Sequence, residues 1–201
     1  MIIAAGAAKE VILILVFVTV LNQHLLKPHK KSQHVTTSGP FYLTQPSPDD
    51  KNNIYDFIVK MNKNLSGEDA GHYASLILKY SDDAAVDAKL VAALIARESR
   101  FNAKATSSSG AMGLGQFIPG TAKLLGVTDA YDPEQNIRAT AAYLKQLIDK
   151  WREKENTVEL ALASYKVGWG TVTKAGGVPQ DASTLEYIES IKKYYQQIQK
   201  K

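Results

Sequence analysis

The chain of 201 residues contains no cysteine, and its histidines are few. The absence of cysteine excludes disulfide bonds and thiolate metal sites, and it fits a periplasmic protein and a cytosolic protein equally well. The four histidines, His24, His29, His34 and His72, share no spacing that would place metal ligands on one helix. We therefore expect no metal site, and no other cofactor is indicated.

The sequence also lacks long stretches in which apolar and polar residues alternate, the pattern that a half-buried strand requires. After residue 53 the apolar residues recur instead at helical spacing. We expect helices at 54–61, from Ser66, from Asp87 to Glu98, and then at 119–125, 134–151, 157–165 and from 184 onward. Ser66 and Asp87 are expected to cap their helices, with Asp69 placed for a capping box. The predicted fold class is all-α.

The overall composition is that of an ordinary globular protein, with 45% hydrophobic and 22% charged residues. The net charge of +4 makes the chain mildly basic. Such a charge suits an anionic polymer such as a cell wall, a membrane surface or nucleic acid, and by itself it does not separate these partners.

The first 26 residues form a separate apolar segment. Residues 11–21 are almost continuously apolar, and the run reaches the roughly 20 residues of a spanning helix only if it includes Lys9 and Glu10. A cleaved signal peptide is the alternative, but no small-x-small cleavage site follows Leu21. A buried core helix is less favoured at a chain terminus. We expect residues 1–26 to be a membrane anchor, residues 27–52 to be a Pro-, Ser- and Lys-rich linker, and residues 53–201 to be the folded domain.

Glu98 ends the helical run that Asp87 begins. A carboxylate in the last turn faces the negative end of the helix dipole, and burial would disfavour its charged form further. Such a glutamic acid can keep its proton near neutral pH, as a general acid must. In an arbitrary helical protein a glutamate at this position would be an ordinary solvated charge. The assignment of Glu98 as a general acid therefore depends on the surrounding motifs.

Those motifs resemble the lytic transglycosylases of the soluble, goose-lysozyme-like superfamily, over about residues 76–195. The matching segments are ESRF at 98–101, GAMGLGQ at 110–116, PGTA at 119–122, ALASYKVG at 161–168 and EYI at 186–188. The resemblance implies a lysozyme-like helical domain that acts on peptidoglycan glycan strands, with no nucleic acid as partner.

The resemblance also implies roles for individual residues. Glu98 matches the single catalytic acid, and Ser107 matches a serine that helps to orient the N-acetyl group of the substrate. Gln116 matches the glutamine of the Gly-Leu-Met-Gln motif. Tyr165 matches the cleft tyrosine of the Ala-Tyr-Asn motif, and Tyr187 matches a late tyrosine that borders the same cleft.

The single acid has a chemical consequence. Glycosidases normally use two carboxylates, yet residues 101–126 contain no aspartate or glutamate, and Asp129, Asp132 and Glu134 are better explained as caps and solvated charge. One carboxylate fits a reaction in which the N-acetyl group of the substrate supplies the second function and the product carries a 1,6-anhydro-muramic end. A hydrolytic muramidase and a non-catalytic wall-binding module are the alternatives.

Three positions depart from the family pattern. Gly115 stands where the family has methionine, which would remove an apolar wall against a sugar ring. Lys166 and Val167 stand where the family has asparagine and alanine. Lys166 could stabilise ionised Glu98, point to solvent or meet a carboxylate of a peptide stem. Of the large aromatic residues nearby, Tyr165 is expected in the cleft, whereas Trp151 and Trp169 are expected in the core.

The expected location is the periplasmic side of a membrane, and the sequence gives one argument against it. Lys27, Lys30 and Lys31 follow the apolar segment, whereas Glu10 offsets Lys9 before it, so the positive-inside bias favours a cytoplasmic domain. The alternative is a phage protein that is packaged with a virion membrane. Components of a virion or a secretion system are conceivable partners, and the sequence identifies none of them.

Overall fold

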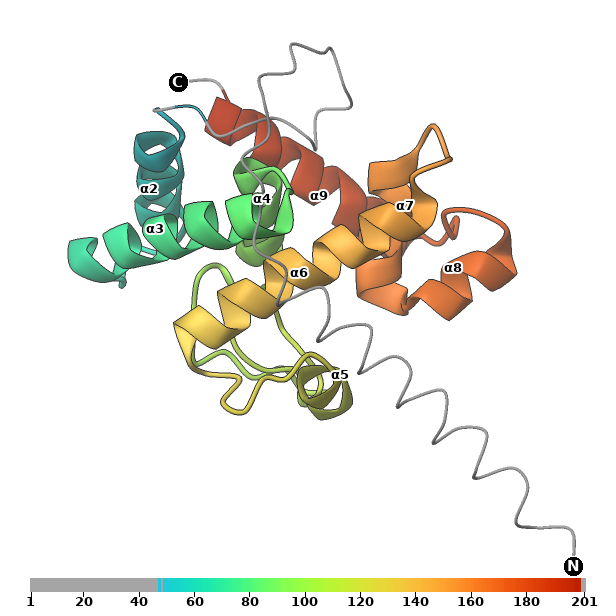
Figure 1. Ribbon diagram of the computed structural model, residues 1–201, viewed down its shortest axis with the longest axis horizontal. Helices are drawn as coiled ribbons and strands as arrows, with labels where there is room; N and C mark the ends of the chain where they lie inside the picture. The colour runs from blue at the N-terminus through green and yellow to red at the C-terminus, as the bar shows by residue number, and fades with distance from the viewer. Residues whose placement is uncertain (1–46, 48, 200–201) are drawn as a thin grey trace, which may run out of the picture. The chain divides into compact units, whose positions relative to one another are not determined.

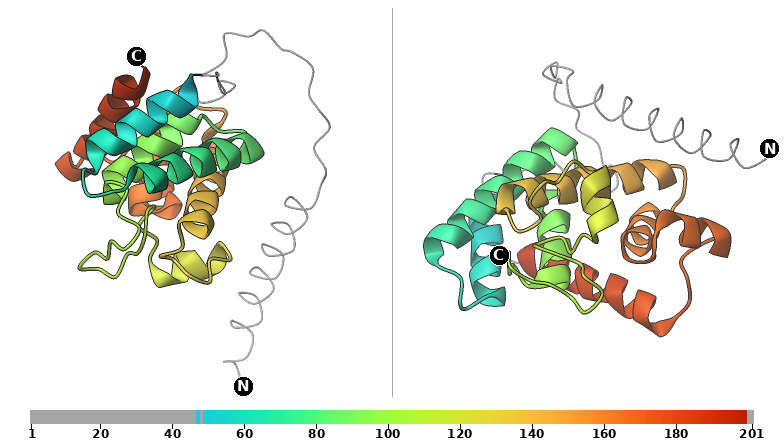
Figure 2. Two further views of the ribbon diagram at one scale, coloured as in Figure 1. Left: turned by 90° about the vertical axis from the view of Figure 1, so that its left-hand side faces the viewer. Right: turned by 90° about the horizontal axis from the view of Figure 1, so that it is seen from below.

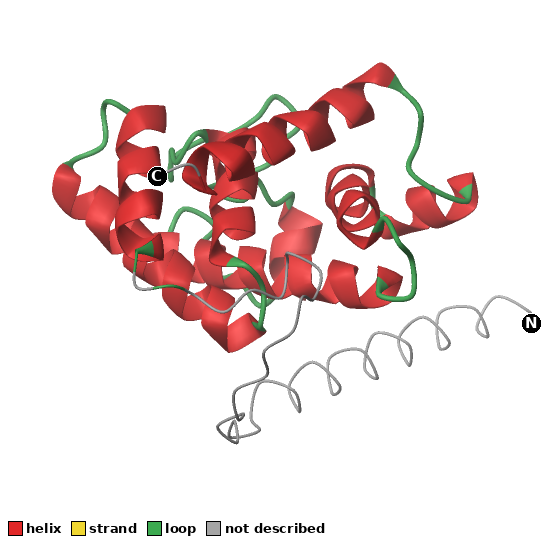
Figure 3. Ribbon diagram, turned by 90° about the horizontal axis from the view of Figure 1, so that it is seen from above, coloured by secondary structure: helices red, strands yellow, loops and turns green. Residues whose placement is uncertain are grey.

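The computed structural model describes residue 47 and residues 49–199, and this part of the chain is helical throughout (Figure 1). Loops join the helices, and the described residues form no strand beyond two isolated bridges, Thr106–Met112 and Met112–Phe117 (Figure 3). The expected all-α fold class is therefore confirmed for these residues. The helices are α2 (Asp50–Met61), α3 (Gly67–Ala84), α4 (Ala88–Ser99), α5 (Pro119–Leu124), α6 (Pro133–Trp151), α7 (Thr157–Val167), α8 (Trp169–Ala175) and α9 (Ala182–Gln199).

Helix α4 lies in the core, and its residues show why. The run from Leu90 to Ala96 consists of alanine and branched aliphatic residues with no polar side chain, and each residue in it is at most 2% exposed. A helix that is apolar on all sides has to be covered on all sides. Helices α2, α3 and α9 pack against it (Figure 2). The last turn of α4 is consequently held by its surroundings on several sides.

A second group of contacts is built on α6, the long helix that crosses the view of Figure 1. Helix α6 packs along α3 and along α7, and α7 in turn contacts α8 and α9. Its buried face carries Ile137, Ala141, Leu144 and Ile148, which recur at helical spacing. The loop between α4 and α5 lies against the N-terminal half of α6, so α6 supports the loop that the sequence motifs mark.

The caps expected at Ser66 and Asp87 are confirmed, but the capping box is not, because the Asp69 carboxylate accepts from the Ser66 hydroxyl instead of the Ser66 backbone amide. The Ser66 hydroxyl accepts a hydrogen bond from the Asp69 amide at 3.0 Å, and Asp87 accepts from the Lys89 amide at 2.7 Å. Asp132 caps α6 by accepting from the Gln135 amide at 2.7 Å. These bonds satisfy amide groups that the first turn of a helix leaves without a partner.

Two elements differ from the expectation. Helix α2 begins at Asp50, so residues 50–52 of the expected linker are helical. The reason is a long-range ion pair, because Lys89 reaches the buried Asp50 carboxylate at 3.0 Å.

Helix α8 is short, and no apolar periodicity in the sequence predicted it. Trp169 at its start is 43% exposed, so the expectation that it lies in the core is wrong. The ammonium of Lys150 lies 4.6 Å from its ring centroid.

The expected membrane anchor, residues 1–26, and most of the expected linker lie outside the described residues. Among residues 49–199, none of the helices combines the length and the apolar character needed to span a bilayer.

Candidate active site

Glu98 lies in the last turn of α4 and is partly buried. The helix ends directly after it, at Ser99, and Arg100 adopts a left-handed conformation with φ 52° and ψ 40°. The Arg100 amide donates to the Ala96 carbonyl, which closes the helix. Because the buried body of α4 fixes this turn, the carboxyl group of Glu98 is held on a rigid support.

The nearest polar partner of Glu98 comes from the other end of the domain. The hydroxyl of Tyr187 on α9 donates a short hydrogen bond to Oε1 of Glu98, across 89 positions of sequence. The other carboxyl oxygen makes no hydrogen bond to a described residue. One oxygen of the carboxyl group is therefore fixed by Tyr187, and the second is not engaged by the described residues.

Two cations lie close to the Tyr187 ring. The guanidinium carbon of Arg97 is 5.3 Å from its centroid, and the ammonium of Lys166 is 5.2 Å from it. Arg97 also donates to the Ser190 hydroxyl at 3.2 Å. Cations over an aromatic ring are attracted by its negative face, so these contacts hold the Tyr187 ring in place as well as adding positive charge.

The pKa of Glu98 is raised above its ordinary value, chiefly because burial disfavours the carboxylate. The hydrogen bond from Tyr187 and the charges of Arg97 and Lys166 oppose this effect without cancelling it. Burial, together with the neighbouring Glu98 charge, raises the pKa of Tyr187 well above the ordinary tyrosine range. Tyr187 is consequently a hydrogen-bond donor rather than a base, and Glu98 is the group that can release a proton.

The loop between α4 and α5 is tied to α6 by one buried asparagine. Asn136 accepts from the Gly115 amide at 2.6 Å and donates to the Ala130 carbonyl at 2.8 Å and to the Met112 carbonyl at 3.4 Å. A fully buried amide side chain is favourable only when its polar atoms are satisfied, and here three backbone groups satisfy them. Asn136 thereby fixes the loop and the turn before α6 to each other.

Gly115 leaves no room for a side chain. A Cβ at this position would lie 2.2 Å from the Thr140 hydroxyl oxygen and 2.9 Å from the Tyr165 hydroxyl oxygen. The idea that a methionine here would restore an apolar wall against a sugar is therefore wrong for this chain. The space that such a side chain would need is filled by hydroxyl groups from α6 and α7. The glycine is required by close approach, since its φ is not positive.

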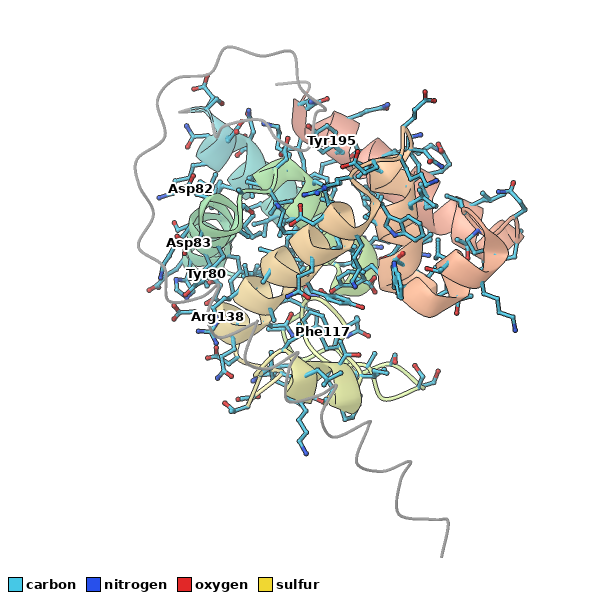
Figure 4. The ribbon with its side chains drawn as sticks, turned by 45° about the vertical axis from the view of Figure 1, so that its right-hand side comes forward. Tyr80, Asp82, Asp83, Phe117, Arg138 and Tyr195 are labelled. Atoms are coloured by element: carbon cyan, nitrogen blue, oxygen red, sulfur yellow. The ribbon has the colours of Figure 1, made fainter. Side chains whose placement is uncertain are left out.

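Tyr165 spans from α7 to this loop. Its hydroxyl donates to the Gly115 carbonyl at 2.8 Å, and its ring lies 5.3 Å from the ring of Tyr143 and 6.0 Å from that of Phe117. Phe117 lies on the loop next to α6 in Figure 4. Burial and the Glu98 charge raise the pKa of Tyr165 well above the ordinary value. The side chain is partly exposed, as a cleft residue would be, but its hydroxyl is engaged by the protein.

The two remaining residues that the resemblance singled out lie within the loop. The side-chain amide of Gln116 donates through Nε2 to the Gly113 carbonyl at 2.9 Å and to the Ala105 carbonyl at 3.2 Å. The Ser107 hydroxyl accepts from the Ala111 amide at 3.0 Å and contacts the Ser109 hydroxyl at 2.9 Å. Through these bonds both side chains hold the loop in shape. Gln116 has a φ of 53°, a left-handed conformation that these bonds stabilise.

Lys166 makes no hydrogen bond or ion pair with Glu98, and its ammonium group is bound at the surface. Its ammonium group donates to the backbone carbonyl and the hydroxyl of Ser183, at the start of α9. Its charge lowers the pKa of Glu98 less than burial raises it. The lysine therefore joins α7 to α9 beside Tyr187, and Glu98 keeps the character of an acid.

Three residues of this site were not predicted from the sequence: Arg97, Asn136 and Thr140. Arg97 adjoins Glu98 in sequence, but its contact with Tyr187 depends on how α9 packs. Asn136 and Thr140 are one helical turn apart on α6. The sequence could have indicated them, because they are two polar residues on an otherwise apolar face of this helix.

Parts of this sequence are similar to known proteins. Residues 75–188 match the family described as the transglycosylase SLT domain. A transglycosylase of Enterobacteria phage PRD1 is 45% identical over 95 residues, which cover 45% of this chain and 34% of the phage protein. A membrane-bound lytic murein transglycosylase F of Photobacterium profundum is 34% identical over 163 residues, which cover 63% of this chain and 31% of that protein. The chain thus spans about a third of the length of these relatives.

The fold is shared with the 70 kDa soluble lytic transglycosylase of Escherichia coli, at a TM-score of 0.55 and 22% identity. The similarity covers 74% of this chain and 28% of that protein.

Proposed function

Because the chain belongs to the transglycosylase SLT domain family, we propose that it is a peptidoglycan lytic transglycosylase with Glu98 as its catalytic acid and base. The observation that carries the proposal is the environment of Glu98. It is one partly buried carboxyl group with a raised pKa, held through one oxygen by Tyr187. A group of this kind suits proton donation to a glycosidic oxygen.

The proposed reaction needs no second carboxylate. Protonated Glu98 gives its proton to the oxygen between two sugars while the bond from that oxygen to C1 of the muramic residue breaks. The carbonyl oxygen of the N-acetyl group of the substrate bonds to C1 and stabilises the cation. Glu98, now ionised, takes the proton of the 6-hydroxyl group, whose oxygen bonds to C1 and displaces the N-acetyl oxygen. The acid is regenerated, a 1,6-anhydro end is formed, and no water is consumed.

The other site residues support this role for Glu98. Tyr187 orients the carboxyl group, and its donated bond stabilises the ionised form that follows the first proton transfer. Tyr165 and Gln116 hold the loop between α4 and α5, and Tyr165 is close enough to Glu98 to be affected by its charge. For Ser107 we propose contact with the N-acetyl group of a bound sugar, since its hydroxyl lies at the partly exposed tip of this loop.

Mass analysis of the products from purified murein tests the proposal. We expect anhydro ends, which are lighter than reducing ends by one water, from the wild-type chain. Glu98→Gln should lose activity by on the order of 100-fold or more, because the transferable proton is gone. Its melting temperature should stay close to that of wild type, since a glutamine oxygen can still accept from Tyr187. Reducing ends would instead identify a hydrolytic muramidase, and binding to murein without products would identify a wall-binding module.

For the location we propose an anchor at residues 1–26 that holds the domain on the periplasmic side of a membrane. The apolar run in the sequence supports this, as does the description of the Photobacterium relative as membrane-bound. A second candidate role, opening of the wall during phage entry from a virion membrane, is favoured by the identity with the phage transglycosylase.

A further inference from the structure

Lys166 connects the two helices that carry the tyrosines of the site. It follows Tyr165 in the last turn of α7, and its ammonium group donates to the backbone carbonyl and the hydroxyl of Ser183 in the first turn of α9. The two helices also pack against each other (Figure 1). The lysine is therefore bound where α9 begins, one helical turn before Tyr187.

The same ammonium group has a second contact on α9. It lies 5.2 Å from the centroid of the Tyr187 ring, within the range of attraction between a cation and an aromatic face. Ser183 and Tyr187 are four positions apart, so they lie on one face of the helix. A single cation thus binds the first turn of α9 and the ring one turn later, which fixes Tyr187 relative to α7.

The charge of Lys166 is not neutralised by an ion pair with any described residue. Its hydrogen-bond partners are the neutral oxygens of Ser183. Hydrogen bonds from Thr184 chiefly lower the pKa of Asp181, and the Lys166 charge adds to that effect across space. The side chain is only partly exposed, so water screens its charge less than that of a free surface lysine.

The ionisable groups that act on Glu98 come from three helices. Burial is the largest influence and raises the pKa of Glu98, whereas the Tyr187 hydrogen bond and the charges of Arg97 and Lys166 lower it. Tyr165 is close enough for the Glu98 charge to affect its own pKa. Arg97 belongs to the same helix as Glu98, and Lys166 is the cation that reaches the pair from α7.

Position 166 is also where the chain departs from the family pattern, which has asparagine. An asparagine side chain is shorter and neutral, so it cannot place a cation at the Tyr187 ring. The contact between Lys166 and Tyr187 is consequently a feature of this chain that the family pattern does not supply.

We propose that Lys166 is a positioning residue for the acid, because it holds the Tyr187 hydroxyl where that group donates to Glu98. The inference rests on the proposed function of Glu98. Loss of the cation frees the first turn of α9 from α7 and removes one of the two contacts that hold the ring. The donated bond to Glu98 then weakens, and the carboxylate is less well stabilised.

The test is a pH series of murein cleavage with variants of the full chain. Lys166→Met removes the charge and both contacts while keeping the length of the side chain. A less stabilised carboxylate has a higher pKa, so the alkaline limb of kcat/KM should move up by about half a pH unit or more. The maximum of kcat/KM should fall about three- to tenfold as the acid loses orientation.

Two further variants serve as controls. Lys166→Arg can keep both contacts, and its profile should stay close to that of wild type. Lys174→Met removes the same charge from an exposed position on α8 and should match wild type. An unmoved alkaline limb in Lys166→Met, or a Lys166→Arg variant that behaves like Lys166→Met, would overturn the proposal.

A double-mutant cycle with Tyr187→Phe distinguishes positioning from a direct effect of the lysine charge. If Lys166 acts through the Tyr187 hydroxyl, Lys166→Met should move the limb in the Tyr187→Phe background by less than half of its shift in the wild-type background. Equal shifts in the two backgrounds would show that the charge acts on Glu98 directly, and the positioning role would be wrong.

A titration that needs no activity separates failure of this inference from failure of the proposed function. If wild type cleaves no murein, the proposed function fails. The pKa of Glu98 is then measured by carbon-13 NMR of the full chain with labelled glutamate carboxyl groups, where Glu98→Gln identifies the signal. A rise in Lys166→Met that shrinks in the Tyr187→Phe background supports the inference, and an equal rise in both or no rise overturns it. If Lys166→Met does not fold, Lys166→Asn takes its place, since the family pattern has asparagine there.

Discussion

Glu98 and Tyr187 form a pair in which the properties of each depend on the other. Burial raises the pKa of the carboxyl group, and the donated hydrogen bond lowers it again. The balance leaves a carboxyl group that can be protonated at the start of the proposed reaction and stabilised when it ionises. Tyr187 is therefore best described as a positioning residue for the acid.

Tyr187→Phe should raise the pKa of Glu98 further, because it removes the group that stabilises the ionised form. A general acid must be protonated, so the rate falls as the pH rises through its pKa. The alkaline limb of the kcat/KM profile should therefore move to higher pH. The maximum rate should fall on the order of tenfold because the carboxyl group is less well oriented. A pH series of murein cleavage measures both effects.

Tyr194→Phe is the matched control, since Tyr194 lies on the same helix and packs on Phe57 at 5.8 Å instead of on Glu98. Its pH profile should match that of wild type. An alkaline limb that stays in place in Tyr187→Phe would show that the hydroxyl does not set the pKa of the acid.

At the level of single residues, the sequence motifs indicated Glu98 and Tyr187 but not the bond between them. The direct contact depends on the packing of α9 on α4, which residue types alone do not specify. The same holds for Gly115, where the motif suggested a missing wall. The hydroxyl groups of Thr140 and Tyr165 that occupy the space come from two other helices.

At the scale of elements, the loop between α4 and α5 behaves as an extension of α6. Asn136 binds its backbone at Gly115 and Met112, and Gly113 lies close enough that a Cβ there would meet the Ala130 carbonyl at 2.0 Å. The loop is consequently shaped by close backbone contacts and buried hydrogen bonds. These close contacts require small side chains in the loop.

Gly115→Ala should destabilise the domain by about 1–3 kcal/mol, because the added methyl group overlaps the Thr140 hydroxyl. Combining it with Thr140→Ala should recover part of the loss by removing that oxygen. Chemical denaturation of the purified chain measures both changes.

Gly120→Ala serves as the control, since nothing lies within 4 Å of a Cβ at that position in α5. It should be neutral or slightly stabilising. Equal stability of Gly115→Ala and Gly120→Ala would contradict the close packing described here.

Most helices were predictable because their signals are local. Ser66, Asp87 and Asp132 cap helices whose apolar residues follow helical spacing. Helix α8 was missed because seven residues that include Gly170 carry no such spacing. The start of α2 was placed late because Asp50 is secured by Lys89, 39 positions away.

At the scale of the whole molecule, the proposed anchor makes a prediction about topology. In spheroplasts that express the full chain, added protease should digest the domain, because cleavage of the wall requires it outside the cytoplasm. The lysines at 27, 30 and 31 act against this orientation. Replacing all three by glutamine should therefore increase the digested fraction.

A cytoplasmic protein that survives the treatment shows that the membranes are intact. Full protection of the domain in the wild-type chain would instead favour the phage route, in which the enzyme stays inside until it is packaged.

The fold class was predicted most completely, because the lack of strand periodicity and the repeated helix caps agree throughout the described residues. Residues 1–26 lie outside the described residues, so the anchor stays a prediction from its apolar run and the charges beside it.

The bond between Glu98 and Tyr187 also has a consequence for biosynthesis. Its partners are 89 positions apart, and α9 is translated after every other described helix. A nascent chain that already contains α4 and the glycine-rich loop lacks the donor that orients the acid. The proposed enzyme therefore acquires its oriented acid only when the final helix docks on α4.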